Sequence, residues 1–346
     1  MKATRVGING LGRIGRAVLR QLADREDLNV VAVNDLASLD ELAYMLRFDS
    51  VHGRFGPVEQ KNSSLVIRGN EIPFSSHKEP PGIPWAEVGA EVVIEATGAF
   101  RSREAAATHL AAGAERVIVS APSDDVDLTV VLGVNEADFD TDLHQVVSLA
   151  SCTTNCLAPV VKVLDQAFGV EQAVFTTIHA YTSSQSLVDG PARSRPRGRA
   201  AAVSIIPTTT GAAKATERVL PELAGRISGM AMRVPVPDGS VTDLVAQLRK
   251  ETTAEEVNDL FREASTRPEL QGILGVSEDR LVSVDIIGDP RSAVVDVANT
   301  HVSHGGVAKV LAWYDNEWGY AARLADFARF MLTKVERVGE GEKASV

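Results

Sequence analysis

The sequence lacks any run of apolar residues long enough to span a bilayer, and it has only two cysteines. The first absence predicts that this is not a membrane protein. Cys152 and Cys156 lie four residues apart, and one such pair cannot build a disulfide framework, so the two thiols have to be judged by their chemistry. Residues 1–9 (MKATRVGIN) pass at once into an alternating strand pattern, which leaves no room for a secretory signal. We therefore expect a cytoplasmic protein.

Positive charge is also scarce. With 35 Lys and Arg against 46 Asp and Glu, the formal net charge is −11. Such a charge repels the phosphates of nucleic acids, so we expect no nucleic-acid partner. The stretch RSRPRGR at 193–199 is a local exception, and a charge run of this kind is typical of a solvated loop.

The chain has 346 residues, more than usually fold around a single hydrophobic core. This length predicts two domains. The hydrophobic fraction of 45% and the charged fraction of 23% are typical of a globular protein.

The first domain begins with a strand, a glycine loop and a helix. Residues 4–9 alternate as a strand does, GLGRIG follows at 10–15, and apolar residues then recur with helical spacing. Gly10, Gly12 and Gly15 fit the G-x-G-x-x-G fingerprint, in which one glycine makes the tight turn, one admits the pyrophosphate and one lets helix and strand pack closely. The helix N-terminus then faces the anion. Alone, the triplet could also be a plain turn.

An acidic residue follows at the distance that the fingerprint requires. A second strand at 28–33 ends in Asn34 and Asp35, about 20 residues past Gly15, where a carboxylate would bind the adenosine ribose hydroxyls. A carboxylate there repels a 2′-phosphate, which favours NAD over NADP. The alternative is that Asn34 and Asp35 only turn the chain after the strand.

Further buried strands extend this pattern into a doubly wound α/β sheet. We expect them at 92–96, 116–120, 129–134 and 145–149, with a helix at about 102–112. Thr97 and Ser120 lie at the carboxyl ends of two of these strands, where ligands bind in open α/β sheets. Either residue could equally belong to a simple turn.

Cys152 is the candidate nucleophile. It follows a strand and precedes apolar residues with helical spacing, so it lies at a helix N-terminus, where amide N–H groups and the helix dipole favour the thiolate. Cys156, one turn further on, is interpreted as a buried structural residue.

A base for this thiol is available in His179, which follows a strand at 173–178. An imidazole can take the thiol proton and later return it to a developing oxyanion. A lone histidine is more often structural, and sequence spacing does not prove that the two side chains meet.

Seven segments in order along the chain resemble the glyceraldehyde-3-phosphate dehydrogenase family. They are GINGLGRIGR (7–16), DSVHGRF (49–55), SCTTNC (151–156), TTIHAYT (176–182), IPTTTGAAKA (206–215), GMAMRVPVP (229–237) and WYDNEWGY (313–320). No single segment is decisive, but together they are highly specific.

The resemblance implies two domains and a covalent mechanism. Residues 1–150, completed by a C-terminal helix at 317–336, would form a Rossmann-type NAD-binding domain. Residues 151–316 would form an α+β catalytic domain with a mixed or antiparallel sheet. The implied reaction converts glyceraldehyde 3-phosphate, NAD and inorganic phosphate into 1,3-bisphosphoglycerate in glycolysis or gluconeogenesis. Cys152 would form the thiohemiacetal and thioester, with His179 as its base.

The resemblance also assigns binding residues. Thr182 and Arg233 would bind the substrate phosphate, and the attacking phosphate would be bound by Ser151, Arg197, Thr210 and Gly211. Thr153 would also belong to the phosphate-binding residues. Beside the glycines, Asp35, Thr97 and Ser120, the cofactor would contact Arg13, Ile14, Asn316 and Tyr320. No metal is expected. The loop at 189–201 (DGPARSRPRGRAA) departs from the common family pattern, so Arg195 and Arg199 stay open as alternatives to Arg197.

Two alternatives and one assembly state complete the expectations. A related erythrose-4-phosphate dehydrogenase would use the same cysteine and histidine, but water would take the thioester. A catalytically idle NAD-binding regulatory protein could share the scaffold, although it would need no nucleophile. The resemblance implies a homotetramer.

Overall fold

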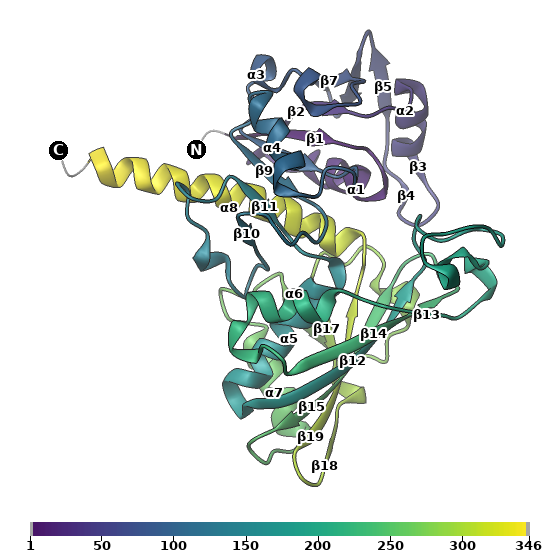
Figure 1. Ribbon diagram of the computed structural model, residues 1–346, viewed down its shortest axis with the longest axis vertical. Helices are drawn as coiled ribbons and strands as arrows, with labels where there is room; N and C mark the ends of the chain where they lie inside the picture. The colour runs from purple at the N-terminus through teal and green to yellow at the C-terminus, as the bar shows by residue number, and fades with distance from the viewer. Residues whose placement is uncertain (1–2, 344–346) are drawn as a thin grey trace. The chain divides into compact units, whose positions relative to one another are not determined.

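The computed structural model describes residues 3–343, with side chains to residue 334, and they form two compact units. The first unit comprises the chain up to residue 130, residues 137–150 and residues from 321 onward, and the second comprises residues 131–136 and 151–320. Figure 1 draws both units.

A mostly parallel sheet forms the centre of the first unit. From edge to edge its strands are β10 (Leu128–Thr129), β11 (Val146–Ser148), β9 (Arg116–Val119), β8 (Val92–Glu95), β1 (Thr4–Asn9), β2 (Leu28–Asn34), β7 (Asn70–Ser75), β6 (Ser64–Ile67) and β5 (Val58–Lys61). The strands from β10 to β7 pair in parallel, whereas β7, β6 and β5 form antiparallel hairpins. Runs of valine and isoleucine form the inner strands because both of their faces are buried.

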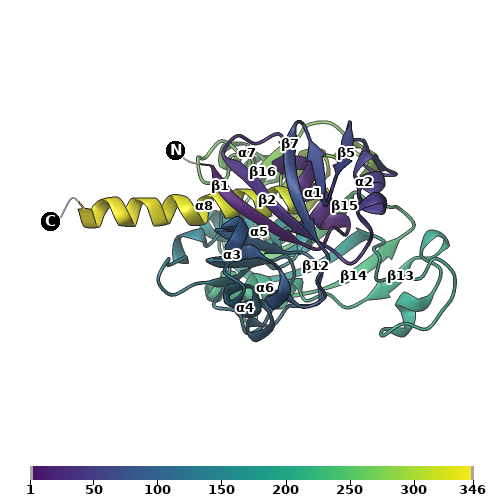
Figure 2. The same cartoon turned by 90° about the horizontal axis from the view of Figure 1, so that it is seen from above.

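Helices cover both faces of this sheet. They are α1 (Arg13–Leu22), α2 (Leu39–Arg47), α3 (Trp85–Val88), α4 (Arg103–Ala111) and α8 (Trp318–Lys343), which contributes its residues from 321 onward. Trp85 of α3 packs on β2 and β8, and Ala106 of α4 packs on β9 and β11, on one side of the sheet (Figure 2). Because parallel crossovers are right-handed, α1 covers the other face. A short hairpin of β3 (Phe48–Asp49) and β4 (Gly53–Arg54) follows α2.

The second unit is built on a mixed sheet. Its strands run in the order β13 (Ile206–Thr208), β14 (Ile227–Val234), β12 (Val170–Ala180), β15 (Ser240–Leu248), β19 (Val307–Tyr314), β17 (Ala293–Asp296) and β16 (Leu274–Ser277), and β18 (His301–Ser303) pairs with β19. Helices α5 (Cys152–Phe168), α6 (Ala212–Val219) and α7 (Ala254–Ala264) contact this sheet. Together the two units confirm the expected fold class.

One expected strand and one helix end were wrong. Of residues 129–134 only Thr129 is in a strand, because Val134 N and Asn135 N both donate to Val131 O in a turn. Gly133 adopts a left-handed φ of 81° there. The apolar run was buried as expected, but in a turn. Helix α8 continues to Lys343, beyond the expected end at 336, and no proline interrupts it.

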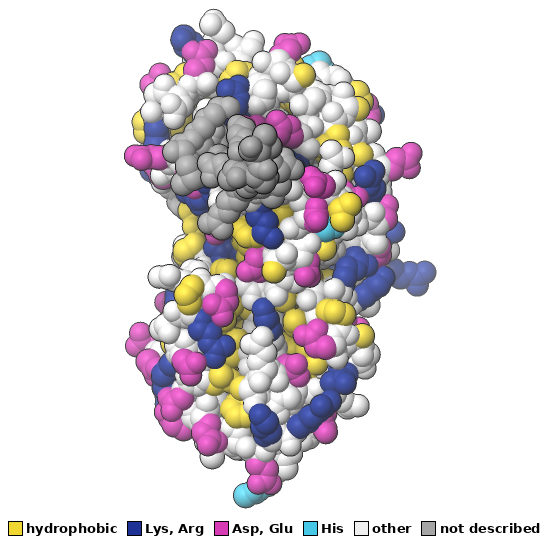
Figure 3. Space-filling model, turned by 90° about the vertical axis from the view of Figure 1, so that its left-hand side faces the viewer, with side chains coloured by type: hydrophobic (Ala, Val, Ile, Leu, Met, Phe, Trp, Pro, Cys, Tyr) yellow, Lys and Arg dark blue, Asp and Glu magenta, His cyan; other side chains and the backbone are white. Residues whose placement is uncertain are grey.

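Among the residues described, none of the helices has both the length and the apolar character needed to cross a membrane. On the face drawn in Figure 3, acidic and basic side chains are interspersed.

Candidate functional site

The three glycines of the loop after β1 meet three different requirements. Gly10 has a left-handed φ of 92°, and a Cβ on it would lie 2.7 Å from Thr97 N. A Cβ on Gly15 would lie 1.9 Å from Gly10 O, so helix and loop can approach only without a side chain. Around Gly12, the N-cap residue of α1, a Cβ would meet nothing within 4 Å. The space over Gly12 is therefore open to a ligand at the helix N-terminus.

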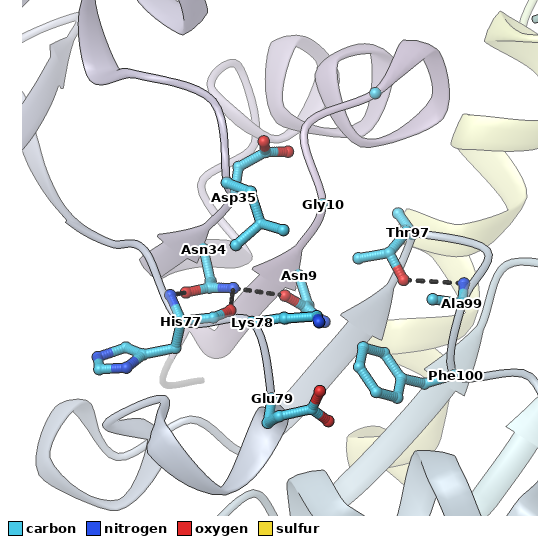
Figure 4. Close-up of a pocket in the computed structure, with 13 residues that line it drawn as sticks. Asn9, Gly10, Asn34, Asp35, His77, Lys78, Glu79, Thr97, Ala99 and Phe100 are labelled. Carbon is cyan, nitrogen blue, oxygen red and sulfur yellow. Dashed lines mark hydrogen bonds between the residues drawn. The ribbon is translucent and has the colours of Figure 1, made fainter.

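A cavity of about 510 Å³ opens at the carboxyl ends of β1, β2 and β8 (Figure 4). Of the expected cofactor residues, Gly10, Gly12, Asp35 and Thr97 line it. The further lining residues are Asn9, Asn34, Leu36, His77, Lys78, Glu79, Ala96, Ala99 and Phe100. The position agrees with the rule that ligands bind at the carboxyl edge of an open α/β sheet.

The backbone holds Asp35, the acidic residue of this cavity that the sequence predicted to bind the ribose. Asp35 Oδ2 accepts a hydrogen bond from Leu11 N at 2.6 Å, and Oδ1 accepts one from Ala37 N at 2.8 Å.

Arg13, at the start of α1, forms an ion pair with Asp49 at 2.5 Å. Although burial raises the pKa of Asp49, the His52 and Val51 amides and Arg13 lower it to about 2.

Ile14 and Ser120 are not among the cavity-lining residues. Ile14 is half-buried in the first turn of α1, and Ser120 directly follows β9, where its N–H donates to Glu95 O at 3.0 Å.

In the second unit the two expected catalytic residues meet. Cys152 is the first residue of α5, and Ser151 caps the helix by accepting a hydrogen bond from Thr154 N at 3.1 Å. Cys152 Sγ lies 3.4 Å from His179 Nε2 near the end of β12. Cys156 is fully buried, with its thiol 3.7 Å from Ala312 O. Helix, thiol and imidazole thus have the arrangement of a nucleophile with its base.

Burial and the nearby Arg233 both act on the pKa values of this pair. It raises the pKa of Cys152 to about 11, while Arg233 and Thr153 act in the opposite direction. Burial, together with the positive charge of Arg233, lowers the pKa of His179 to about 3. Burial thus acts against the charged form of both groups, while Arg233 and the helix N-terminus favour the thiolate. A neutral imidazole can accept the thiol proton.

Hydrogen bonds orient the imidazole. His179 Nδ1 lies 2.7 Å from Ala180 O, and with the ring proton on Nδ1 its Nε2 can accept a proton from sulfur. Arg233 Nη1 donates to Ala180 O at 2.8 Å and lies 2.8 Å from Nδ1. The guanidinium therefore lies within one hydrogen bond of the catalytic pair.

The candidate phosphate ligands belong to the same unit as this pair. Arg197 is half-buried, and its Nε donates to Thr208 Oγ1 at 3.1 Å, two residues before Thr210. Arg199 is exposed and paired with Asp189 at 2.7 Å, and Arg195 is exposed too. This difference favours Arg197 among the three arginines.

The remaining expected residues are placed as follows. Thr210 Oγ1 accepts from Ala212 N at 3.2 Å, and Gly211 is the exposed N-cap residue of α6. Thr182 Oγ1 lies 2.8 Å from Ser184 Oγ. Thr153 Oγ1 lies 3.0 Å from Tyr314 OH.

Both units match models of one family. The glyceraldehyde 3-phosphate dehydrogenase NAD binding domain matches residues 4–103, and the C-terminal domain of the same enzyme matches residues 151–316. A glyceraldehyde-3-phosphate dehydrogenase of Geobacillus stearothermophilus is 50% identical over 333 residues, which cover 96% of this chain and 99% of the relative. The chain belongs to the glyceraldehyde-3-phosphate dehydrogenase family.

Other members of the glyceraldehyde-3-phosphate dehydrogenase family are similarly close. The enzyme of Streptomyces coelicolor is 49% identical, covering 94% of this chain and 98% of the relative. Glyceraldehyde-3-phosphate dehydrogenase 1 of Bacillus subtilis is also 49% identical, covering 96% of this chain and 99% of its own.

Sequence reasoning missed two residues that support the catalytic pair. Tyr314 OH lies 2.7 Å from Thr177 Oγ1, and its ring packs edge-on against His179. Ser240 Oγ donates to Asn316 Oδ1 at 2.5 Å and accepts from Ala180 N at 3.1 Å. Ser240 begins β15, which pairs with β12, and Tyr314 ends β19, which pairs with β15, so only the strand pairing could have revealed them. Tyr320 is buried, and burial raises its pKa.

Proposed function

We propose that the protein is a phosphorylating glyceraldehyde-3-phosphate dehydrogenase. It oxidises D-glyceraldehyde 3-phosphate to 1,3-bisphosphoglycerate with NAD and inorganic phosphate, a reaction of glycolysis and gluconeogenesis. The observation that carries this function is the distance of 3.4 Å between Cys152 Sγ and His179 Nε2 at the start of α5. A pure nucleotide-binding protein has no need of such a pair.

The catalytic pair acts in two stages. The Cys152 sulfur attacks the aldehyde carbon while its proton passes to His179 Nε2, which then stabilises the new oxygen together with the Cys152 backbone N–H. NAD, when bound, would supply the acceptor for the hydride whose loss turns the thiohemiacetal into a thioester. Inorganic phosphate attacks the carbonyl carbon of this thioester, and the carbon–sulfur bond breaks. The acyl phosphate departs, and Cys152 remains as a thiolate.

Two anions have to be bound at this site. We assign the substrate phosphate to Thr182 and Arg233. The attacking phosphate is assigned to Ser151, Thr153, Arg197, Thr210 and Gly211. Hydroxyls, amides and arginine forks are the groups that suit phosphate oxygens. The half-buried position of Arg197 beside Thr208 supports its choice over Arg195 and Arg199.

NAD fits the donor groups of the first unit. The open space above Gly12 at the N-terminus of α1 suits the pyrophosphate, and Asp35 suits the ribose hydroxyls. We assign the rest of the cofactor site to Gly10, Arg13, Ile14, Gly15, Thr97, Ser120, Asn316 and Tyr320. The hydrogen bond from Ser240 to Asn316 Oδ1 leaves the amide nitrogen of Asn316 as the group for a carboxamide oxygen.

An assay of NADH formation tests this function. We expect turnover of glyceraldehyde 3-phosphate that depends on phosphate or arsenate. Turnover that is indifferent to phosphate but strong with erythrose 4-phosphate would indicate the related dehydrogenase instead, and no turnover by the reduced protein would indicate an idle scaffold. Cys152→Ser should abolish turnover, whereas Cys156→Ser, at a buried thiol in the same helix, should retain most of it.

The domain limits and the assembly state belong to the same proposal. We assign residues 1–150 with the C-terminal helix to the NAD-binding domain and residues 151–316 to the catalytic domain. A homotetramer is supported by apolar side chains on one face of the second sheet, Val174, Val245 and Met230, which are 56%, 37% and 37% exposed. Sedimentation equilibrium should give the mass of four chains. Two free thiols suit the reducing cytoplasm, where we place the enzyme.

A further inference from the structure

A row of buried polar side chains extends from the wall of the cavity in the first unit into the sheet. Asn34, Asn9 and Glu95 are the last residues of the neighbouring strands β2, β1 and β8, and the strand register pairs Asn9 with both of the others. Each of the three is no more than 3% exposed, and His109 of α4, which joins them, is fully buried. Neither the fingerprint glycines nor Asp35 explains why a carboxylate and an imidazole are buried here.

Backbone groups fix the direction of the hydrogen bonds from one side. Asn34 Oδ1 accepts from His77 N and its Nδ2 donates to His77 O, both at 2.9 Å, so the amide cannot be reversed. Asn34 Nδ2 also donates to Asn9 Oδ1 at 2.8 Å. Asn9 must therefore donate through Nδ2, which lies 2.6 Å from Glu95 Oε2.

An indole fixes the direction from the other side. Trp85 Nε1 can only donate, and it lies 2.9 Å from His109 Nδ1. Nδ1 is therefore the acceptor, and the ring proton is on Nε2, which donates to Glu95 Oε2 at 3.1 Å. The other carboxylate oxygen, Oε1, accepts from Thr97 N at 2.8 Å and from the Thr97 hydroxyl.

Four groups thus converge on the two oxygens of Glu95: the Asn9 amide, the His109 Nε2–H, and the N–H and hydroxyl of Thr97. Three of them are N–H donors whose direction is fixed. The groups that Glu95 holds are those that face the cavity. Asn9 and Thr97 line it, and the Thr97 hydroxyl accepts from Ala99 N, of another lining residue, at 3.0 Å.

We propose that Glu95 and His109 are positioning residues for NAD binding. They hold the Asn9 amide and the backbone of Thr97, which lies against Gly10, in the positions that the cofactor requires. That role rests on the proposed function, because it takes the cavity as part of the NAD site. Neither residue touches the cofactor; each acts through Asn9 and Thr97.

Glu95→Gln is the test, because it keeps the shape of the side chain and removes only the acceptor. Whichever way the new amide turns, its NH₂ group faces at least one N–H donor that cannot reverse. We expect the Kd of the full-length enzyme for NAD, measured by calorimetry, to rise about tenfold, which corresponds to about 1.4 kcal/mol. The kcat and the KM for glyceraldehyde 3-phosphate should stay within about twofold of the wild-type values, given that tenfold reference scale.

Asp127→Asn is the matched control. Asp127 is a carboxylate of the same unit that accepts from Gln145 N, Val146 N and Arg103 Nε at 2.7–2.9 Å and does not line the cavity. It should lower the Tm and leave the Kd for NAD unchanged. The double variant Asn9→Asp with Glu95→Gln moves the carboxylate one strand along, where Asn34 and the new amide can donate to it and His109 Nε2 lies 3.4 Å away. It should bind NAD more tightly than either single variant.

The outcomes separate the two hypotheses. A wild-type protein that does not bind NAD would contradict the proposed function. If the wild type binds NAD, an unchanged Kd in Glu95→Gln, or a Kd that rises equally in Asp127→Asn, overturns the role of Glu95. If Glu95→Gln alone is insoluble, a soluble double variant that binds NAD supports the role, and an insoluble one overturns it.

Discussion

Replacing Arg197 by alanine should weaken the binding of the attacking phosphate and leave the first half of the reaction intact. Its guanidinium is half-buried and held by Thr208 Oγ1 at 3.1 Å and Thr209 O at 3.4 Å, directly before Thr210 and Gly211. A hydrogen bond between charged partners contributes about 1.5–3 kcal/mol. The KM for phosphate should therefore rise roughly 10- to 150-fold.

Arg199→Ala is the control for this prediction. Arg199 is exposed and paired with Asp189, and an exposed ion pair contributes about 0–1 kcal/mol, so the KM for phosphate should rise less than about fivefold. The assay is the initial rate of NADH formation against phosphate, with glyceraldehyde 3-phosphate and NAD saturating. In the absence of phosphate, the burst of NADH that accompanies thioester formation should keep its amplitude in Arg197→Ala. An equal effect in Arg199→Ala, or a raised KM for the aldehyde alone, would refute the assignment.

Three further predictions concern other parts of the molecule. Asp35→Ala removes a carboxylate that repels a 2′-phosphate by several kcal/mol, so the ratio of kcat/KM for NADP to that for NAD should rise at least about tenfold; an unchanged ratio would mean that the ribose is bound elsewhere. The pKa of Asp49 is lowered from 3.8 to about 2, so its contribution to stability, about 2 kcal/mol, is present above pH 4 and is lost as the pH falls through 2. Urea unfolding of Asp49→Asn at pH 7 should show that loss, and the difference from the wild type should shrink in acid. Ala150 is fully buried and has a left-handed φ of 52°, a conformation that strains a residue with a side chain. Ala150→Gly should therefore change the free energy of unfolding by less than about 1 kcal/mol, whereas Ala150→Val should lower it by more than about 2 kcal/mol. Equal effects of the two substitutions would contradict a strained backbone at this position.

Much of the first unit could be predicted because its signals are local. The glycine loop, the flanking strand and helix, and the acid at residue 35 lie within one stretch of chain, and their periodicities differ clearly. The apolar run 130–132 misled the prediction of a strand. Its composition correctly indicated burial, but composition does not reveal the turn around Gly133. The same limit explains why Glu95 and His109 escaped notice, because a polar residue at a strand end is ordinary until its neighbours across the sheet are known.

The sequence by itself determined that Cys152 starts a helix and that Cys156 is buried one turn later, because helical spacing within a single segment decides both. The tertiary structure alone decided that His179, 27 residues further on, reaches the sulfur, because this contact depends on how α5 packs against β12. It also decided that Arg197, and not Arg195 or Arg199, is held beside Thr208. The sequence presents all three as similar residues of one loop, and only the folded loop shows which of them is half-buried. The pKa of Cys152 also depends on the tertiary structure, because burial raises it while Arg233, which is distant in the sequence, acts in the opposite direction.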